Sequence, residues 1–137
     1  MKILAFQLRE ELQPYFPLEK RGNIWLPDLW FYSPKLKEVE QFLQTSWVDK
    51  LNYIKDTWDC DDFALALLAD CRRYTRWLVE FCHVDRKEAC PWTLVEVWDK
   101  QHSFNAVRTR DKGIKFIEPQ SDKIFDYTEG NLIYARG

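Results

Sequence analysis

The sequence predicts an α+β fold in which a central, buried helix packs on a small antiparallel sheet. Apolar side chains recur every three or four positions between residues 60 and 81, which is the spacing of one helix face. Three later segments, 92–98, 103–109 and 114–118, have the apolar and β-branched character of strands. Because the helical pattern precedes the strands, we expect the strands to form a meander against the helix.

The first third of the chain predicts shorter elements. Residues 2–12 form a helix or a strand that runs into one, and prolines keep 13–33 mostly extended or looped. Ser33 and Pro34 then begin a helix as its N-cap and first residue. Residues 47–54 form a further helical turn or two before the long helix.

The remaining connections are short. The charged residues 85–88 form a solvated loop after the long helix, and a turn at 111–113 separates two of the strands. Pro119 ends the strand that carries Glu118. Residues 124–125 and 132–134 form short closing strands.

Length and composition limit the classes of function. The 137 residues, 46% of them hydrophobic, predict one domain over 1–137 with a sizeable core. A net charge of −2 gives no general attraction to nucleic acid or to anionic membrane. No apolar run reaches the length of a membrane-spanning helix. The spacing of the four cysteines is not that of a disulfide scaffold, so we expect a reducing, cytoplasmic setting.

Cys60 is the candidate nucleophile. It lies at the start of the long helix, with Asp59 as the expected N-cap and two aspartates in the first turn. The helix dipole and the free backbone N–H groups stabilise a thiolate there, and the same N–H groups can hold an oxyanion. The bland interpretation is a small buried residue at a helix start.

A nucleophilic thiol needs a base and a group that orients the base. His102 precedes a strand and has the near-neutral pKa of a general base. Glu118 ends the next strand and is the expected orienter. Asn105 is a rival, although its position three residues after His102 turns it to the other face of a strand. Gln120 and residues 52, 53 and 57 are candidate oxyanion donors, and Trp58 is expected to line a groove.

These three motifs, at 60–64, 102–105 and 117–125, resemble the papain-like protease domain at the C-terminus of certain fungal agglutinins. They are similar also to small bacterial and phage proteins of that type, and more loosely to transglutaminase-like cysteine peptidases. The resemblance covers about residues 58–125. It implies a papain-like fold, a Cys60–His102–Glu118 triad, and an association of the aspartate pair after the cysteine with calcium.

The carboxylates beside Cys60 are a candidate metal site. Asp59, Asp61 and Asp62 would oppose thiolate formation by like-charge repulsion. A hard cation such as Ca²⁺ would cancel that charge, since it prefers several carboxylate and carbonyl oxygens. The bland interpretation is helix capping with solvated charge.

Two functions therefore compete. The first is a thiol hydrolase of the cysteine-peptidase type that cleaves amide bonds, with calcium dependence implied by the resemblance. The alternative is a catalytically inactive binding module, a phage or bacterial interaction or inhibitor protein, that holds a peptide or protein partner in an aromatic groove. Selective alkylation of Cys60 discriminates between them.

Overall fold

The computed structural model describes residues 1–85 and 89–137. Apart from Asp85, the predicted loop over 85–88 lies outside these residues. The helices are α1 (Ala5–Leu12), α2 (Leu36–Thr45) and α3 (Cys60–Phe81), with 3-10 turns at Gln13–Tyr15, Leu18–Lys20 and Val48–Lys50. The strands are β1 (Lys2–Leu4), β2 (Ile24–Trp25), β3 (Trp30–Tyr32), β4 (Leu94–Trp98), β5 (Ser103–Thr109), β6 (Gly113–Glu118), β7 (Lys123–Phe125) and β8 (Tyr134–Arg136).

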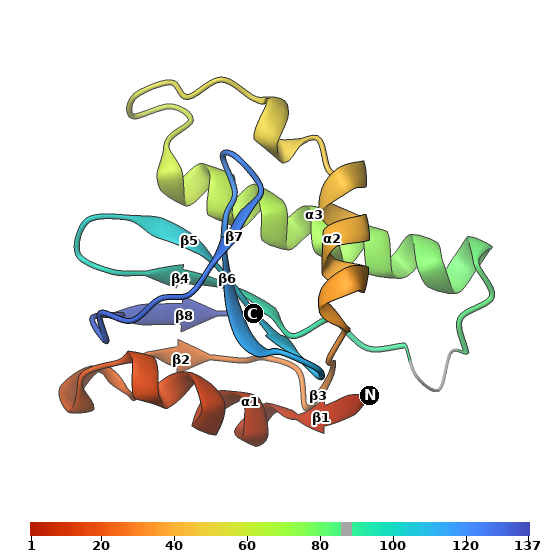
Figure 1. Ribbon diagram of the computed structural model, residues 1–137, viewed down its shortest axis with the longest axis horizontal. Coiled ribbons are helices and arrows are strands. Elements are labelled where there is room, and N and C mark those ends of the chain that lie inside the picture. Colours follow the sequence, from red (N-terminus) through yellow and green to blue (C-terminus); the bar gives the residue numbers. More distant parts are fainter. Residues whose placement is uncertain (86–88) are drawn as a thin grey trace.

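The main sheet has six strands in the order β2-β8-β4-β5-β6-β7 (Figure 1). The strands from β4 to β7 pair as an antiparallel meander, with Ala106 of β5 opposite Val95 and Phe116. The last strand, β8, adds to the other side of β4 and pairs in parallel with β2. A separate two-stranded sheet joins β1 to β3. The two ends of the chain are thus tied into sheets beside the meander.

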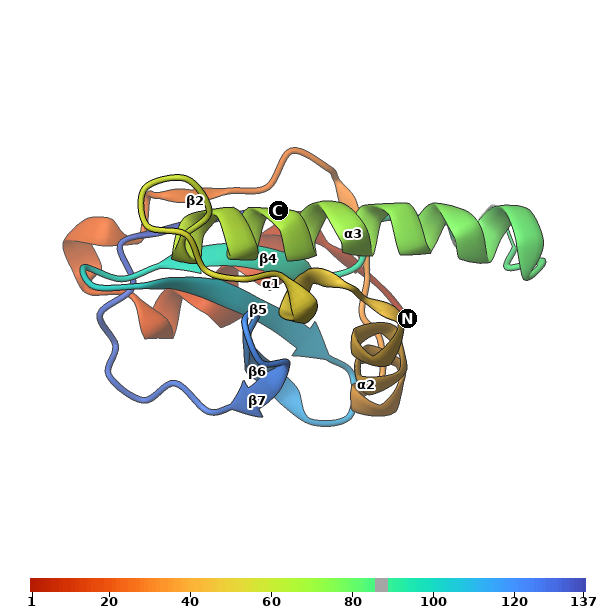
Figure 2. The same cartoon turned by 90° about the horizontal axis from the view of Figure 1, so that it is seen from above.

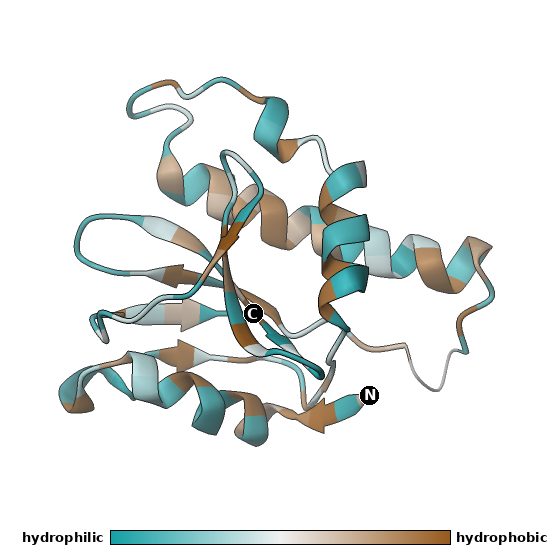
Figure 3. Ribbon diagram, in the orientation of Figure 1, coloured by the Kyte–Doolittle hydropathy of each residue, from teal (hydrophilic) through white to brown (hydrophobic). Residues whose placement is uncertain are grey.

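Both faces of the main sheet are covered. Alternate residues of a strand point to opposite faces, and in β5 Phe104 and Ala106 belong to one apolar cluster while Val107 belongs to the other. The first cluster is closed by Leu8 and Leu12 of α1. The second cluster is closed by α2 and α3. This explains why β4 and β5 are buried at nearly every position. Hydrophobic stretches of the sheet are brown in Figure 3.

α3 lies along one face of the sheet and extends beyond its edge (Figure 2). Its residues Phe63, Leu67 and Cys71 are buried, whereas no residue after Cys71 is. Twenty-two helical residues span about 33 Å, while a seven-residue strand spans about 24 Å. The helix is therefore longer than the strands on which it packs. Among the described helices, none is long and apolar enough to cross a membrane.

The predicted central, buried helix on a small antiparallel sheet is wrong in three respects. α3 is covered on one side only, because Leu65 and Trp77 are 43% and 47% exposed. The sheet has six strands, and its β2–β8 pair is parallel. The strands that the prediction missed have two or three residues, which is too short to show a strand period in the sequence.

The predicted start of the second helix is also wrong. α2 begins at Leu36, with Lys35 in the N-cap position, and not at Pro34. The Ser33 hydroxyl donates instead to the Arg108 carbonyl at 2.9 Å, which ties this segment to β5. A tertiary hydrogen bond has therefore taken the side chain that local sequence rules assign to a cap.

A substitution at Leu67 tests which face of α3 is buried. Its side chain is fully buried in the cluster beneath α2 and α3. We expect Leu67→Ala to lower the free energy of unfolding by roughly 2–5 kcal/mol, because a buried leucine leaves a cavity. The matched control is Leu65→Ala, the same change on the exposed side of the helix. Chemical denaturation of both variants measures the difference, and a loss below about 1 kcal/mol for Leu67→Ala would contradict this packing.

Candidate functional site

The start of α3 carries Cys60 and three carboxylates. Asp59 occupies the N-cap position, its carbonyl accepts from the Phe63 N–H at 3.1 Å, and its own N–H donates to Asp62 Oδ2 at 3.1 Å. Cys60 is the first residue of the helix and is half-buried. The local sequence therefore places the thiol at the positive end of the helix dipole.

His102 and Glu118 lie side by side. His102 precedes β5, and its backbone N–H donates to Asp99 Oδ1 at 2.8 Å in the turn after β4. Its ring nitrogen Nε2 is 2.6 Å from Glu118 Oε2, at the end of β6. The Gln120 N–H donates to the other Glu118 oxygen at 3.2 Å. The hydrogen bond between the His102 ring and Glu118 raises the pKa of His102, and burial of the ring opposes this effect.

Asn105 connects the sheet to α3. Its side chain is fully buried, and Nδ2 donates to the Ala64 carbonyl at 2.9 Å. Asn105 is three residues after His102, and Ala64 is four residues after Cys60. The first turn of α3 and the loop that ends at His102 lie at the same end of the molecule (Figures 1 and 2). Asn105 thus holds the two parts of the candidate site on one framework.

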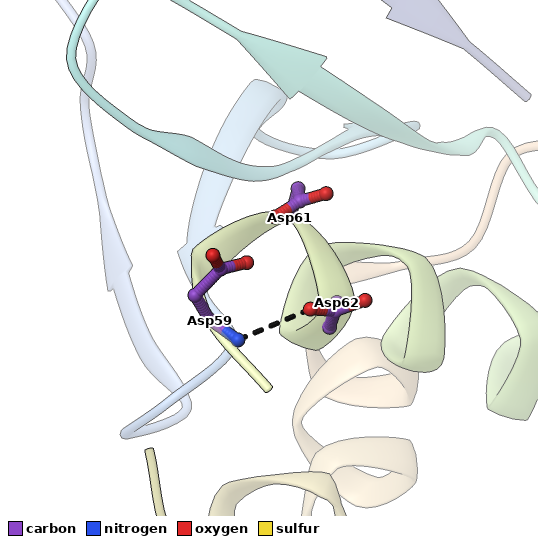
Figure 4. A group of neighbouring side chains, drawn as sticks. All are labelled: Asp59, Asp61 and Asp62. Carbon is purple, nitrogen blue, oxygen red and sulfur yellow. Dashed lines mark hydrogen bonds between the residues drawn. The ribbon is translucent and has the colours of Figure 1, made fainter. Parts of the chain in front are cut away.

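The three carboxylates form a compact group around the first turn of α3 (Figure 4). Asp59, Asp61 and Asp62 each offer an oxygen, and these oxygens lie within 4.8 Å of one another. The pKa of Asp59 is raised to about 6, first by its hydrogen bond with Asp61 and then by burial and the neighbouring charges. The group therefore holds more negative charge than its surroundings compensate.

The other predicted binding residues lie in different settings. Trp58 precedes the N-cap, is half-buried, and packs edge-on against Phe63 at 5.9 Å. Its indole nitrogen is buried and has no hydrogen-bond partner among residues 1–85 and 89–137. Gln120 lies in the turn after β6, where its backbone supports Glu118. Asn105 serves the helix–sheet contact and does not contact His102 through any hydrogen bond within the described residues.

Sequence reasoning missed a second acidic contact. Asp49, in the 3-10 turn before α3, meets Asp122, in the turn between β6 and β7. Each has a buried Oδ1 atom that no described residue hydrogen-bonds. Burial, followed by the Asp49 charge, raises the pKa of Asp122 to about 7. No local signal could have paired them, but the aspartate three positions before His102 is a turn signal that could have identified Asp99.

The comparisons with known proteins identify the fold alone. No family model matches the chain, and no curated protein matches it. One similar solved structure is PSL1a in a complex with E64, with a TM-score of 0.82 and 13% identity over 99% of this chain and 51% of that chain. Another is a crystal structure of Polyporus squamosus lectin bound to the human-type influenza-binding epitope Neu5Acα2-6Galβ1-4GlcNAc. Its TM-score is 0.77, with 14% identity over 99% of this chain and 49% of that chain.

These structures correct the papain-like assignment. The chain spans about half the length of each solved chain, and both are structures of a lectin. The predicted papain-like or transglutaminase-like fold is therefore corrected to the fold of the matched half of these solved chains. The predicted thiol hydrolase of the cysteine-protease type is likewise not supported, because the similar solved structures are lectin structures.

The His102–Glu118 pair predicts a pH-dependent contribution to stability. A histidine with a raised pKa stabilises the fold below its unfolded-state value of about 6.5, and this contribution is lost as the pH rises through the folded-state pKa. We expect Glu118→Gln to lower the pKa of His102, measured by NMR titration of the ring, and to reduce this pH dependence. The second histidine, His83, is the internal control. An unchanged His102 titration would show that Glu118 does not interact with the ring.

The Asp49–Asp122 contact also predicts that the stability of the fold falls as the pH rises. The cause here is a buried carboxyl group beside another carboxylate. The pKa of Asp122 rises from 3.8 to about 7 on folding, so the folded protein holds a proton that the unfolded chain releases. Stability should therefore fall as the pH rises from about 4 to about 7. In Asp122→Asn we expect a smaller fall in Tm over this range, measured by thermal unfolding. Asp126→Asn, an equal change of charge on a mostly exposed side chain, should retain it. An equal pH dependence of Tm in both variants would contradict the retention of a proton by Asp122 in the folded protein.

Proposed function

We propose that the protein is a binding module without turnover, whose ligand site lies at the N-terminal end of α3 around a divalent cation. The observation that carries this proposal is the group of carboxylate oxygens of Asp59, Asp61 and Asp62 within 4.8 Å of one another. The lectin neighbours support a binding role for this fold, since the chain aligns with them over 99% of its length.

The donor set fits a hard cation. Ca²⁺ prefers carboxylate oxygens and tolerates flexible geometry. Adjacent side chains on a helix diverge by about 100°, so Asp61 and Asp62 alone do not face one ion. Asp59 lies outside the helix in the N-cap position, and its buried Oδ1 lacks a hydrogen-bond partner in the described parts of the chain. It supplies the third oxygen, and the cation offsets the repulsion among the three carboxylates.

The chemistry of such a site favours a hydroxyl-rich ligand. Ca²⁺ takes about six to eight oxygen ligands, and three carboxylates leave positions that the hydroxyl groups of a carbohydrate can fill. Trp58 and Gln120 are the proposed flanking contacts, and Cys60 with the His102–Glu118 pair forms the proposed polar wall. The epitope bound by the lectin is not proposed as the ligand of these residues, because this chain covers only 49% of that lectin chain.

The proposed setting is a reducing, cytoplasmic one. The observation behind it is the half-buried Cys60 thiol, which is in no disulfide. A reducing compartment keeps such a thiol available.

Calcium titration tests the cation site. We expect Ca²⁺ at about 10⁻⁴–10⁻³ M, the weak end of protein sites, to raise the Tm of the whole chain. At about 100 times Kd the added stability would be about 2.7 kcal/mol. Binding should weaken as the pH falls through about 6, because Asp59 then holds a proton that competes with the cation. The alkylation rate of Cys60 by iodoacetamide should rise with calcium, because nearby negative charge is cancelled.

The matched pair for this test is Asp61→Asn and Asp56→Asn. Both changes remove one carboxylate near the helix start, but Asp56 is exposed and outside the three-carboxylate group. Asp61→Asn should lose the effect of calcium on Tm and on alkylation, and Asp56→Asn should keep it. If calcium changes neither the Tm nor the alkylation rate of the wild-type protein, the aspartates are helix caps and the proposal of a cation site is wrong.

Glycan-array binding with and without EDTA tests the ligand class. Calcium-dependent retention of a glycan that is lost in Asp61→Asn supports the proposal. Incubation with an unfolded protein such as casein tests the absence of turnover, with Cys60→Ala as the control. Fragments that form with the wild type and not with Cys60→Ala would overturn the proposal of a binding module without turnover.

A further inference from the structure

A cavity lies between α2 and α3. The two helices cross near the point where α3 passes the edge of the sheet (Figure 2). Its volume is about 350 Å³, within the size range of ligand pockets. The α3 residues that line it recur at helical spacing and therefore form one face. The lining residues are Phe42 and Thr45 from α2, and Asp70, Arg73, Tyr74 and Trp77 from α3.

Three of the six lining residues are aromatic. The Phe42 and Tyr74 rings have centroids 5.2 Å apart, and Trp77 stacks on Tyr74 at 5.8 Å with an angle of 26°. Phe42 is fully buried, whereas Trp77 is 47% exposed. The wall is therefore rigid at its base and presents an accessible indole ring at its rim.

A carboxylate lies among these rings. The Asp70 side chain is only 6% exposed, and the ion pair that the described residues give it is with Arg73, one turn along the same helix. Arg73 Nε is 3.1 Å from Asp70 Oδ1, and Nη2 also contacts this oxygen. The Arg73 side chain is 69% exposed. A buried carboxylate requires a cationic partner, and here that partner is a flexible side chain at the rim.

We propose that this cavity binds an arginine side chain of a peptide or protein partner, which takes the place of Arg73 on Asp70. A guanidinium pairs with a carboxylate through two N–H groups and stacks on aromatic rings, so it satisfies both parts of the cavity at once. Arg73 demonstrates in the free protein that Asp70 accepts a guanidinium. Its displacement costs little, because the Arg73 side chain is 69% exposed and the incoming guanidinium keeps Asp70 paired.

The site is distinct from the proposed cation site. Asp70 is ten residues after Cys60, about 15 Å further along α3. The competing ligand is a neutral, hydroxyl-rich molecule that would accept hydrogen bonds from Arg73 and donate them to Asp70. The two ligands give opposite results when Arg73 is removed, since the arginine ligand competes with Arg73 and the neutral ligand uses it.

The experiment titrates the whole chain with the peptide acetyl-Gly-Gly-Arg-Gly-Gly-amide and follows amide chemical shifts. We expect saturable shifts at Phe42, Tyr74 and Trp77, with EDTA present or absent. The same peptide with citrulline, the uncharged isostere of arginine, should not bind. Asp70→Asn should weaken binding at least about tenfold, and Trp77→Ala several-fold, because each removes one half of the interaction.

Arg73→Ala gives the decisive result. We expect binding to tighten about two- to fivefold, the equivalent of the ion pair that no longer competes. The matched control is Arg76→Ala, which removes a similarly exposed arginine that pairs with Glu80 on the same helix and does not line the cavity. It should leave the affinity unchanged. Weaker binding in Arg73→Ala, equal binding of the citrulline peptide, or no shifts at the three aromatic residues would each overturn the proposal. These readouts do not involve calcium, so they stand or fall apart from the cation site.

Discussion

The architecture depends on the contact of α3 with strand β5, and Asn105 is the polar part of that contact. Its amide donates to the Ala64 carbonyl from a fully buried position, between apolar residues that pack the same interface. A buried amide is costly unless it is hydrogen-bonded, so the helix and the strand have one favourable register. That register positions the first turn of α3, with Cys60 and the carboxylates, relative to the sheet end that carries His102 and Glu118.

The sheet supports this contact because it is apolar on both faces. α1 covers one face through Leu8 and Leu12, and α2 with α3 covers the other. The central strands therefore bury nearly every residue. The one charged side chain fully buried in them, Glu96, is neutralised by Arg136 of β8 at 2.9 Å and accepts from the Trp98 indole at 2.6 Å. The Glu96–Arg136 ion pair thus connects the C-terminal strand β8 to β4 of the meander.

Carboxylates are the recurrent chemical feature outside the core. The group at the start of α3 and the Asp49–Asp122 contact both bring like charges together, and in each the pKa of one carboxyl is raised. Like charges persist at such distances when a proton or a cation is shared between them. Asp70 is the opposite case, since a carboxylate among aromatic rings is paired with a cation. The molecule thus presents two different kinds of charged site, one at the start of α3 and one at its middle.

The sequence by itself determined the elements with a long local period. It located α3 between Cys60 and Phe81, since twenty-two residues repeat the helical spacing and Asp59 marks the start, and it located the strands that bring His102 next to Glu118. It also misled, because three short motifs resembled a protease domain while two solved structures with a similar fold are lectin structures. Only the tertiary structure decided that β2 pairs with β8, that α3 covers one face, and that Asp49 meets Asp122. Those contacts join residues far apart in the chain, and they depend on strand pairing and burial in the folded protein, which no local pattern of residues records.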